Sequence, residues 1–218
     1  MPKVGVLLSG CGVFDGAEIH EAVLTLLALD QHKAQVVCCA PNIDFGEVDH
    51  LTQKPTGQKR NVLREAARIA RGEIRDLATV KADELDALIL PGGFGAAKNL
   101  STFADQGAEC SVNADVARLV GDCLARRKPV GAICIAPATL ARIAAQRGIQ
   151  AKLTVGNDPG TAQAITAMGC THENRPVTEI AVDADHKIVT TPAYMLGPGP
   201  AAVWEGIGKL VEQILRMI

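Results

Sequence analysis

Residues 128–139 read KPVGAICIAPAT, a short apolar strand pattern that ends on Cys134 and turns at once into a helix. Pro137 suits the first turn of a helix, and Leu140 and Ile143 then recur at helical spacing. The pattern predicts a thiol raised above a strand end and facing a helix N-terminus, where free N–H groups stabilise a thiolate. We therefore expect Cys134 to be a nucleophile. The alternative is a buried core cysteine without chemistry.

The rest of the chain alternates strand patterns with helical patterns. Strands are expected at Val4–Leu8, Gln35–Ala40, Leu85–Leu90, Val130–Ile133, Val177–Val182 and Lys187–Thr191. Helices are expected at Glu18–Leu29, Asn61–Ala70, Val112–Ala125, Ala138–Ala145 and Ala201–Ile218. This alternation predicts one α/β domain over residues 1–218, with a mostly parallel sheet covered on both faces and a mixed edge near the end.

Residues 42–59 contain Pro, Gly and charged residues without clear periodicity. Such a segment is either a surface excursion or a lid over the site. The excursion is the preferred interpretation.

Composition argues against several classes of function. The net charge is -2 and aromatic residues make up 3% of the chain, so neither a basic face nor stacking groups favour a nucleic-acid partner. The chain starts on a strand pattern and has neither signal-peptide architecture nor a membrane-spanning apolar run, which predicts a cytoplasmic protein. Its 7 cysteines form no CxxC pair, so no disulfide framework or metal site is expected.

In a parallel sheet, ligands bind beyond the carboxyl ends of the strands, so the loops there are candidates for a site. Residues 9–21 read SGCGVFDGAEIHE and leave the first strand. Their glycines have GxGxxxG spacing instead of GxGxxG, and the second strand ends without an acidic residue placed for a ribose. We therefore expect no nucleotide cofactor.

Glu18 and Glu21 lie one helical turn apart, so that one of them could reach Cys134. A carboxyl beside a thiolate in a partly dry pocket would have a raised pKa and could shuttle a proton. The alternative is an acidic residue that only stabilises the helix N-terminus. His20 points to another face and is expected at the surface or behind the site.

The loop LPGGFGAAKNL, residues 90–100, follows the next buried strand. Backbone N–H groups of Gly92 and Gly93 could hold an oxyanion, and we place Ile135 with them as a substrate-binding residue. The alternative is a glycine-rich turn that needs a positive φ. Tyr194, after the last strand, could line the pocket or only pack.

Four segments resemble the ElbB/ES1 family, in the ThiJ/PfpI branch of the class I glutamine amidotransferase-like superfamily. They are SGCGVFDGAEIHEAVLTLLAL (9–29), NVLREAARIARGEIR (61–75), ALILPGGFGAAKNLS (87–101) and KIVTTPAYML (187–196). The resemblance covers nearly the whole chain. It implies a flavodoxin-like three-layer sandwich with a cysteine nucleophile elbow, often a homodimer, that converts glyoxal to glycolate without a cofactor.

In that resemblance the family cysteine is Cys134, and the family glutamate is Glu18 or Glu21. Nearness to the helix N-terminus favours Glu18, and counting back from the second strand favours Glu21. Many relatives carry histidine after the cysteine, where this chain has Ile135. Residues 191–193, Thr-Pro-Ala, also lack the histidine and glutamate of a glutaminase, so a glutaminase triad is not expected.

The leading hypothesis is a glyoxalase-type lyase that acts on a small dicarbonyl or aldehyde. Cys134 would form a hemithioacetal, a glutamate would move the proton through an enediol, and water would release the 2-hydroxy acid. The alternative is a non-catalytic redox-responsive or small-ligand-binding protein that uses the same cysteine. A synthase subunit fed by a partner is a third interpretation, which the missing glutaminase residues disfavour.

Overall fold

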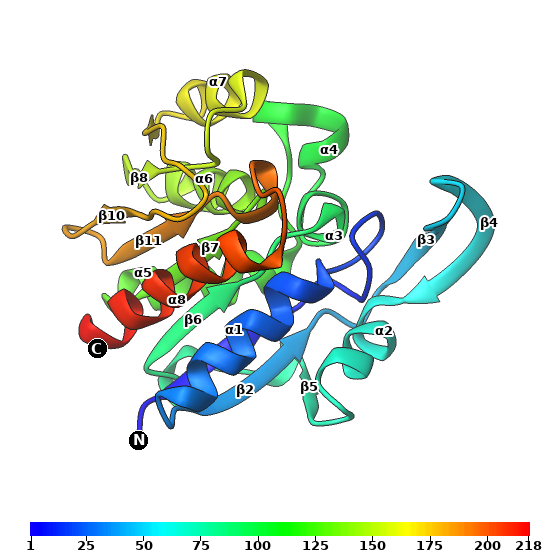
Figure 1. Cartoon of the computed structure of the whole chain (residues 1–218), viewed down its shortest axis with the longest axis horizontal. Helices are drawn as coiled ribbons and strands as arrows, with labels where there is room; N and C mark the ends of the chain where they lie inside the picture. Colours follow the sequence, from blue (N-terminus) through cyan, green and yellow to red (C-terminus); the bar gives the residue numbers. More distant parts are fainter.

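Seven strands form the central sheet of the computed structural model, which describes residues 1–218 (Figure 1). Across the sheet they are β10 (Ala181–Asp183), β11 (Ile188–Thr191), β7 (Val130–Ile133), β6 (Ala87–Leu90), β1 (Lys3–Leu7), β2 (Gln35–Ala40) and β5 (Ile74–Asp76). All neighbours pair in parallel except β10 and β11, which are antiparallel. The predicted α/β fold with a mostly parallel sheet and a mixed edge is confirmed.

Helices cover both faces of this sheet. One face carries α1 (Ile19–Gln31), α8 (Pro200–Arg216) and α2 (Val62–Ile69), with α1 and α8 side by side (Figure 1). The other face carries α5 (Ala114–Ala125) and α6 (Ala136–Gln146). Shorter elements are α3 (Phe94–Lys98), α4 (Phe103–Gln106), α7 (Pro159–Ala167) and the strand pair β8 (Lys152–Leu153) and β9 (Thr171–His172). None of the helices has the length and apolar composition needed to cross a bilayer.

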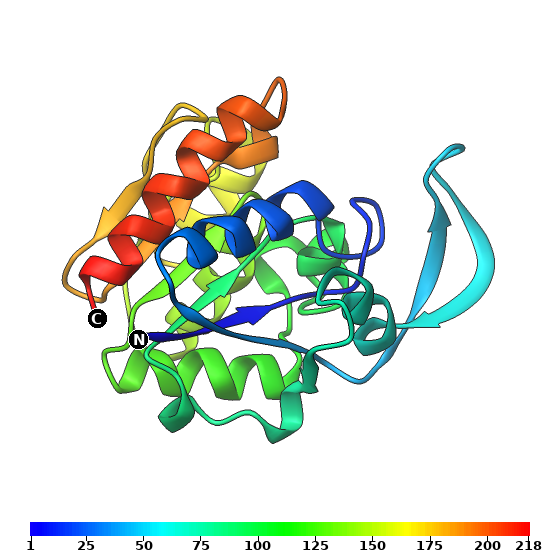
Figure 2. The same cartoon turned by 60° about the horizontal axis from the view of Figure 1, so that its bottom comes forward.

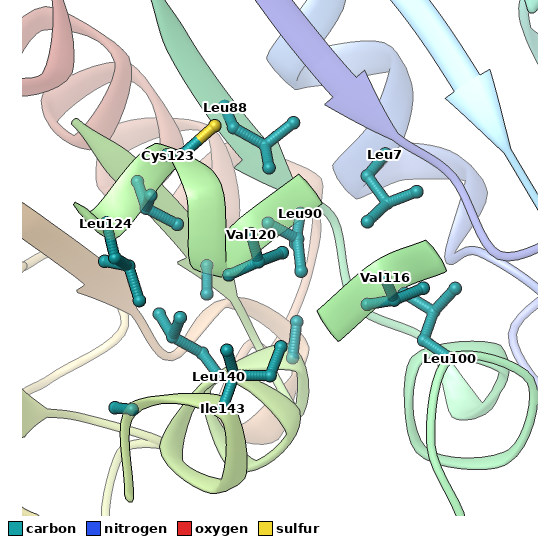
Figure 3. Close-up of a cluster of buried hydrophobic side chains, with 14 of the residues drawn as sticks. Leu7, Leu88, Leu90, Leu100, Val116, Val120, Cys123, Leu124, Leu140 and Ile143 are labelled. Carbon is teal, nitrogen blue, oxygen red and sulfur yellow. The ribbon is translucent and has the colours of Figure 1, made fainter. Parts of the chain in front are cut away.

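The central strands are apolar throughout because both of their faces are covered. Strands β6 and β7 read ALIL and VGAI, and every residue in them is buried. A strand packed on both faces loses the polar alternation of a half-exposed strand. Figure 3 shows the cluster between β6, α5 and α6, which includes Leu88, Leu90, Val116, Val120, Leu140 and Ile143.

Most of the segment 42–59 forms an antiparallel hairpin that projects from the body of the molecule (Figure 2). Its strands are β3 (Asp44–Asp49) and β4 (Lys54–Asn61), and all residues from 51 to 60 are exposed. The hairpin was missed because β4 is exposed on both faces, and such a strand has no alternation of apolar and polar residues to reveal it. It contacts the body where Val48 N donates to Asp15 Oδ2 over 2.8 Å.

The predicted strand at Val177–Val182 is wrong over most of its length, because only its last two residues belong to β10. The preceding carbonyl groups have other contacts. Glu179 O accepts a 2.9 Å hydrogen bond from the hydroxyl of Thr191. The Val177 carbonyl packs against Gly206 of α8. These contacts hold the segment as a loop beside the sheet.

The strands β1, β6, β7 and β11 are parallel, and each is next to another of the four in the sheet. Their carboxyl ends therefore open at the same edge. The loops that follow them carry the three sequence segments predicted to form a site.

Candidate active site

Cys134 occupies a sharp turn between β7 and α6. Its φ is 61°, in the left-handed region that non-glycine residues seldom adopt. A 2.9 Å hydrogen bond from Cys134 N to Thr191 O ties this turn to the end of β11. Strained backbone of this kind is found at functional sites, where the surrounding structure holds it in place. The turn places a thiol that is only 7% exposed at the sheet edge.

Glu21 is the glutamate that reaches Cys134. Its side chain is fully buried, and its carboxyl lies beside the thiol of Cys134, so that each group shifts the pKa of the other. Its Oε2 accepts a 2.9 Å hydrogen bond from Gly92 N, and its Oε1 accepts a 3.2 Å hydrogen bond from Tyr194 N. The loops after β6 and β11 thus hold the Glu21 carboxyl in a fixed place beside the sulfur of Cys134, which lies in the turn after β7.

Glu18 has a different position. It is the N-cap of α1, and its Oε2 accepts a 2.7 Å hydrogen bond from Glu21 N. The cap turns the Glu18 carboxylate toward the end of the helix, so that it lines the pocket beside Cys134. The two glutamates therefore share a helical turn but not a contact with the sulfur.

Gly92 permits the close approach of these groups. A Cβ at Gly92 would lie 2.5 Å from Cys134 Cβ and 2.7 Å from Glu21 Oε2, closer than real Cβ contacts come. The Gly92 N–H already donates to Glu21. The prediction that this amide holds an oxyanion does not fit the geometry, because its one hydrogen is in use.

The N–H groups of Gly93 and Ile135 do point at the sulfur of Cys134. Both hydrogen-bond to Cys134 and favour its ionised form. Gly93 has a φ of 91°, and a Cβ there would collide with Glu18 N. These two residues, predicted to bind substrate, thus present their backbone N–H groups at the bottom of the pocket.

Burial sets the protonation of the Cys134 and Glu21 pair. Burial, and then the charge of Glu18, raise the pKa of Glu21 to about 8. Burial and the charge of Glu21 raise the pKa of the Cys134 thiol above its usual range, against the two N–H groups that lower it. A resting thiolate, as expected from the helix N-terminus alone, is therefore disfavoured. The resting pair at neutral pH is a thiol beside a carboxylic acid.

A pocket of about 380 Å³ opens over Cys134. This volume is within the range of sites that bind small molecules. Tyr194, whose position the sequence left open, lines the pocket, and its hydroxyl lies 2.7 Å from Nδ1 of the exposed His20. The lining residues are Val13, Glu18, Gly93, Phe94, Cys134, Ile135, Asp158, Thr161, Tyr194 and Met195. The hairpin β3–β4 contributes none of them, so it is not a lid over this pocket.

Asp158 and Thr161 were missed by the sequence analysis. Asp158 is the N-cap of α7 and accepts a 2.8 Å hydrogen bond from Thr161 N. The pair Asp158-Pro159 is a recognisable helix start, since Asp favours the N-cap and Pro the first turn. That signal predicts a helix but not that its N-terminus lies at the pocket. No group of three or more His, Cys, Asp or Glu side chains is arranged to hold a metal ion.

Comparison with known proteins gives one family. The sequence model of the DJ-1/PfpI family matches residues 11–191. A human relative, glutamine amidotransferase-like class 1 domain-containing protein 3, mitochondrial, is 44% identical over 99% of this chain and 83% of its own length. The zebrafish ES1 protein, mitochondrial, is 34% identical over 99% of this chain and 86% of its own length.

Solved structures agree with these matches. An isoprenoid biosynthesis protein with an amidotransferase-like domain from Ehrlichia chaffeensis superposes with a TM-score of 0.94 at 34% identity. That alignment covers 100% of this chain and 99% of the other. A DJ-1 superfamily protein from Salmonella typhimurium, at 21% identity and a TM-score of 0.59, shares the fold.

Proposed function

The chain belongs to the DJ-1/PfpI family, and from that premise we propose that it is a glyoxalase-type enzyme that converts glyoxal to glycolate through a hemithioacetal on Cys134. The contact between Glu21 and Cys134 at the bottom of a small-molecule pocket carries the proposal. A nucleophile and a proton carrier in contact are the minimum that this chemistry needs.

The reaction begins when Cys134 Sγ attacks one aldehyde carbon of glyoxal. Ionised Glu21 accepts the thiol proton and delivers it to the carbonyl oxygen, which gives a neutral hemithioacetal. Negative charge that develops during the attack is stabilised by the N–H groups of Gly93 and Ile135.

The second stage moves a proton between the two carbons. Glu21 removes the C–H proton of the hemithioacetal carbon, which gives an enediolate, and returns that proton to the neighbouring carbon, while the hydroxyl proton moves from the first oxygen to the second. The first carbon is oxidised as the second is reduced, so the product is the thioester of glycolate with Cys134. Water attacks the acyl carbon, the C–S bond breaks, and the sulfur regains its proton. The net reaction adds one water to glyoxal.

Glycolate formation from glyoxal by the purified protein tests this proposal. Free thiol at a matched concentration sets the background. We expect Cys134→Ala to abolish turnover and Glu21→Gln to reduce it roughly a hundredfold or more, the usual effect of losing a proton carrier. Cys11→Ala is the matched control, because Cys11 is a half-buried thiol outside the pocket. Turnover no faster than free thiol, or retained by Cys134→Ala, would refute the proposal.

A redox-responsive protein is the second candidate. The hydrogen bonds that Gly93 and Ile135 direct at the sulfur would also stabilise an oxidised, negatively charged cysteine. The raised pKa of the Cys134 thiol counts against this role at neutral pH, because the thiolate is the form that peroxide attacks.

Location and assembly stay predictions for this chain. The names of the human and zebrafish relatives describe those proteins as mitochondrial. The cytoplasmic location and the homodimer expected from the sequence remain to be measured, by fractionation and by sedimentation.

A further inference from the structure

Four helices begin at the pocket, and their N-termini are of two kinds. The helices α1 and α7 are capped by the carboxylates of Glu18 and Asp158. The helices α3 and α6, which begin beside Gly93 and Ile135, have no side-chain cap. A carboxylate cap more than offsets the partial positive charge of a helix N-terminus, whereas an uncapped end keeps it.

This difference divides the pocket by charge. At its bottom, the uncapped N–H groups of Gly93 and Ile135 face Cys134. On its walls, Glu18 and Asp158 are the charged side chains, and no Lys, Arg or His lines the pocket. Hydrogen bonds from Thr161 lower the pKa of Asp158, so that this carboxylate is ionised at neutral pH. The other lining side chains are mostly apolar, which weakens the screening of these charges.

We propose that Glu18 and Asp158 are specificity-determining residues, which admit uncharged and cationic aldehydes to Cys134 and reject carboxylates. That the selected molecules are aldehydes rests on the proposed function. The selection by charge concerns access to the thiol of Cys134 itself. Small oxo-acids of the same size as glyoxal are rejected at the walls. Negative charge that forms on the substrate after it has entered is stabilised by the N–H groups at the bottom of the pocket.

The same arrangement bears on product release. Glyoxal enters without charge, and glycolate leaves as an anion. Two fixed carboxylates repel that anion once it leaves the N–H groups, so they speed its departure. The wild-type protein should therefore be only weakly inhibited by glycolate.

Charge-selective thiol reagents test the selection without any turnover. Methyl methanethiosulfonate is uncharged, its 2-aminoethyl analogue is cationic, and its 2-sulfonatoethyl analogue is anionic. In each case the cysteine sulfur attacks the reagent sulfur and methanesulfinate leaves. Rates at Cys134 are read by peptide mass spectrometry and divided by the rates with free 2-mercaptoethanol. We expect the anionic reagent to react roughly tenfold more slowly than the uncharged one at low salt, and the gap to shrink at high salt.

Conservative variants assign the effect to its residues. Glu18→Gln and Asp158→Asn keep a capping oxygen and remove the charge. The double variant should lose most of the preference for the uncharged reagent over the anionic one, and glycolate should inhibit its turnover more strongly. Asp185→Asn is the control, because it removes the same charge from an exposed turn at the opposite end of β11. Cys11 is an internal reference, because the charges that act on its pKa are Glu65, Arg68 and Asp15.

Each outcome decides the proposal. The proposal is supported if the anionic reagent reacts more slowly than the uncharged one in the wild type and in Asp185→Asn, and if the two reagents react at similar normalised rates in the double variant. Equal normalised rates, a faster anionic reagent, a preference that survives in the double variant, or no reaction with the uncharged reagent overturns it. Selective labelling without glyoxal turnover would retain the charge selection and remove only the proposed enzyme activity.

Discussion

Gly92 N donates a 2.9 Å hydrogen bond to Glu21 Oε2, so the loop after β6 fixes the carboxyl that lies beside Cys134. The N–H that had been expected to hold an oxyanion thus positions the carboxyl for which we propose a proton-carrying role. The absence of a side chain on Gly92 matters equally, because Cys134 Cβ occupies the adjacent space.

Gly92→Ala is the most direct test of this arrangement. Its Cβ would overlap Cys134 and Glu21, and the overpacking should lower the free energy of unfolding by roughly 1–3 kcal/mol. Glyoxal turnover should fall at least tenfold, because small displacements of reacting groups are costly. Urea denaturation and steady-state kinetics measure the two effects. Gly208→Ala in α8, where a Cβ meets no atom within 4 Å, is the control and should be slightly stabilising. Normal turnover in Gly92→Ala would contradict the geometry.

The pH dependence of turnover should follow Glu21. Its pKa is raised to about 8, and the ionised form is the one that accepts the thiol proton. Activity should therefore rise as pH increases through about 8. Glu18→Gln removes a negative charge that raises this pKa, so the rise should move to lower pH. A kcat/KM profile for both proteins checks this, and an unshifted profile would argue against Glu21 as the titrating group.

Stability should change with pH in the same range. The folded pKa of Glu21 is about 8 and its usual value is 4.5, so the folded chain retains a proton that the unfolded chain loses. The free energy of unfolding should therefore fall as pH rises from about 4.5 to about 8, by roughly 4 kcal/mol from this group. Glu21→Gln should flatten the curve, as followed by urea denaturation at several pH values. An equal slope in that variant would assign the effect to other groups.

The rate at which hydrogen peroxide oxidises Cys134 distinguishes the proposed enzyme from the redox-responsive alternative. Burial and the charge of Glu21 raise the pKa of Cys134, so oxidation should be slow at pH 7 and faster at higher pH. Above about pH 8, where Glu21 is ionised, Glu21→Gln removes the neighbouring negative charge and should speed oxidation. Mass spectrometry of the Cys134 peptide measures sulfenate and sulfinate. Rapid oxidation of the wild type at pH 7, without glyoxal turnover, would favour the redox role.

The turn that carries Cys134 between β7 and α6 could be predicted from sequence because its determinants are local. An apolar strand, Cys134 and Pro137 within a few residues specify a strand, a turn and a helix start. The resemblance to the ES1 group is likewise confirmed, since it depends on ordered segments along the whole chain. The mostly parallel sheet followed from the alternation of strands and helices.

Local sequence could not decide whether Glu18 or Glu21 lies beside Cys134. Glu18 and Glu21 are both compatible with the first turn of a helix, and only tertiary contacts decide which one is buried. Glu18 became the cap, and Glu21 met N–H groups from Gly92 and Tyr194, which are far away in sequence. Asp158 reached the pocket in the same way, through the placement of α7 and not through any property of its own segment.

The hairpin β3–β4 makes the molecule vulnerable to limited proteolysis at one place. Its basic residues Lys59 and Arg60 are exposed on an element that projects from the body, which is where trypsin should cut first. The seven-stranded sheet does not include either hairpin strand, and no hairpin residue lines the pocket over Cys134. A nicked protein should therefore stay folded as two associated fragments, with the thiol of Cys134 still enclosed.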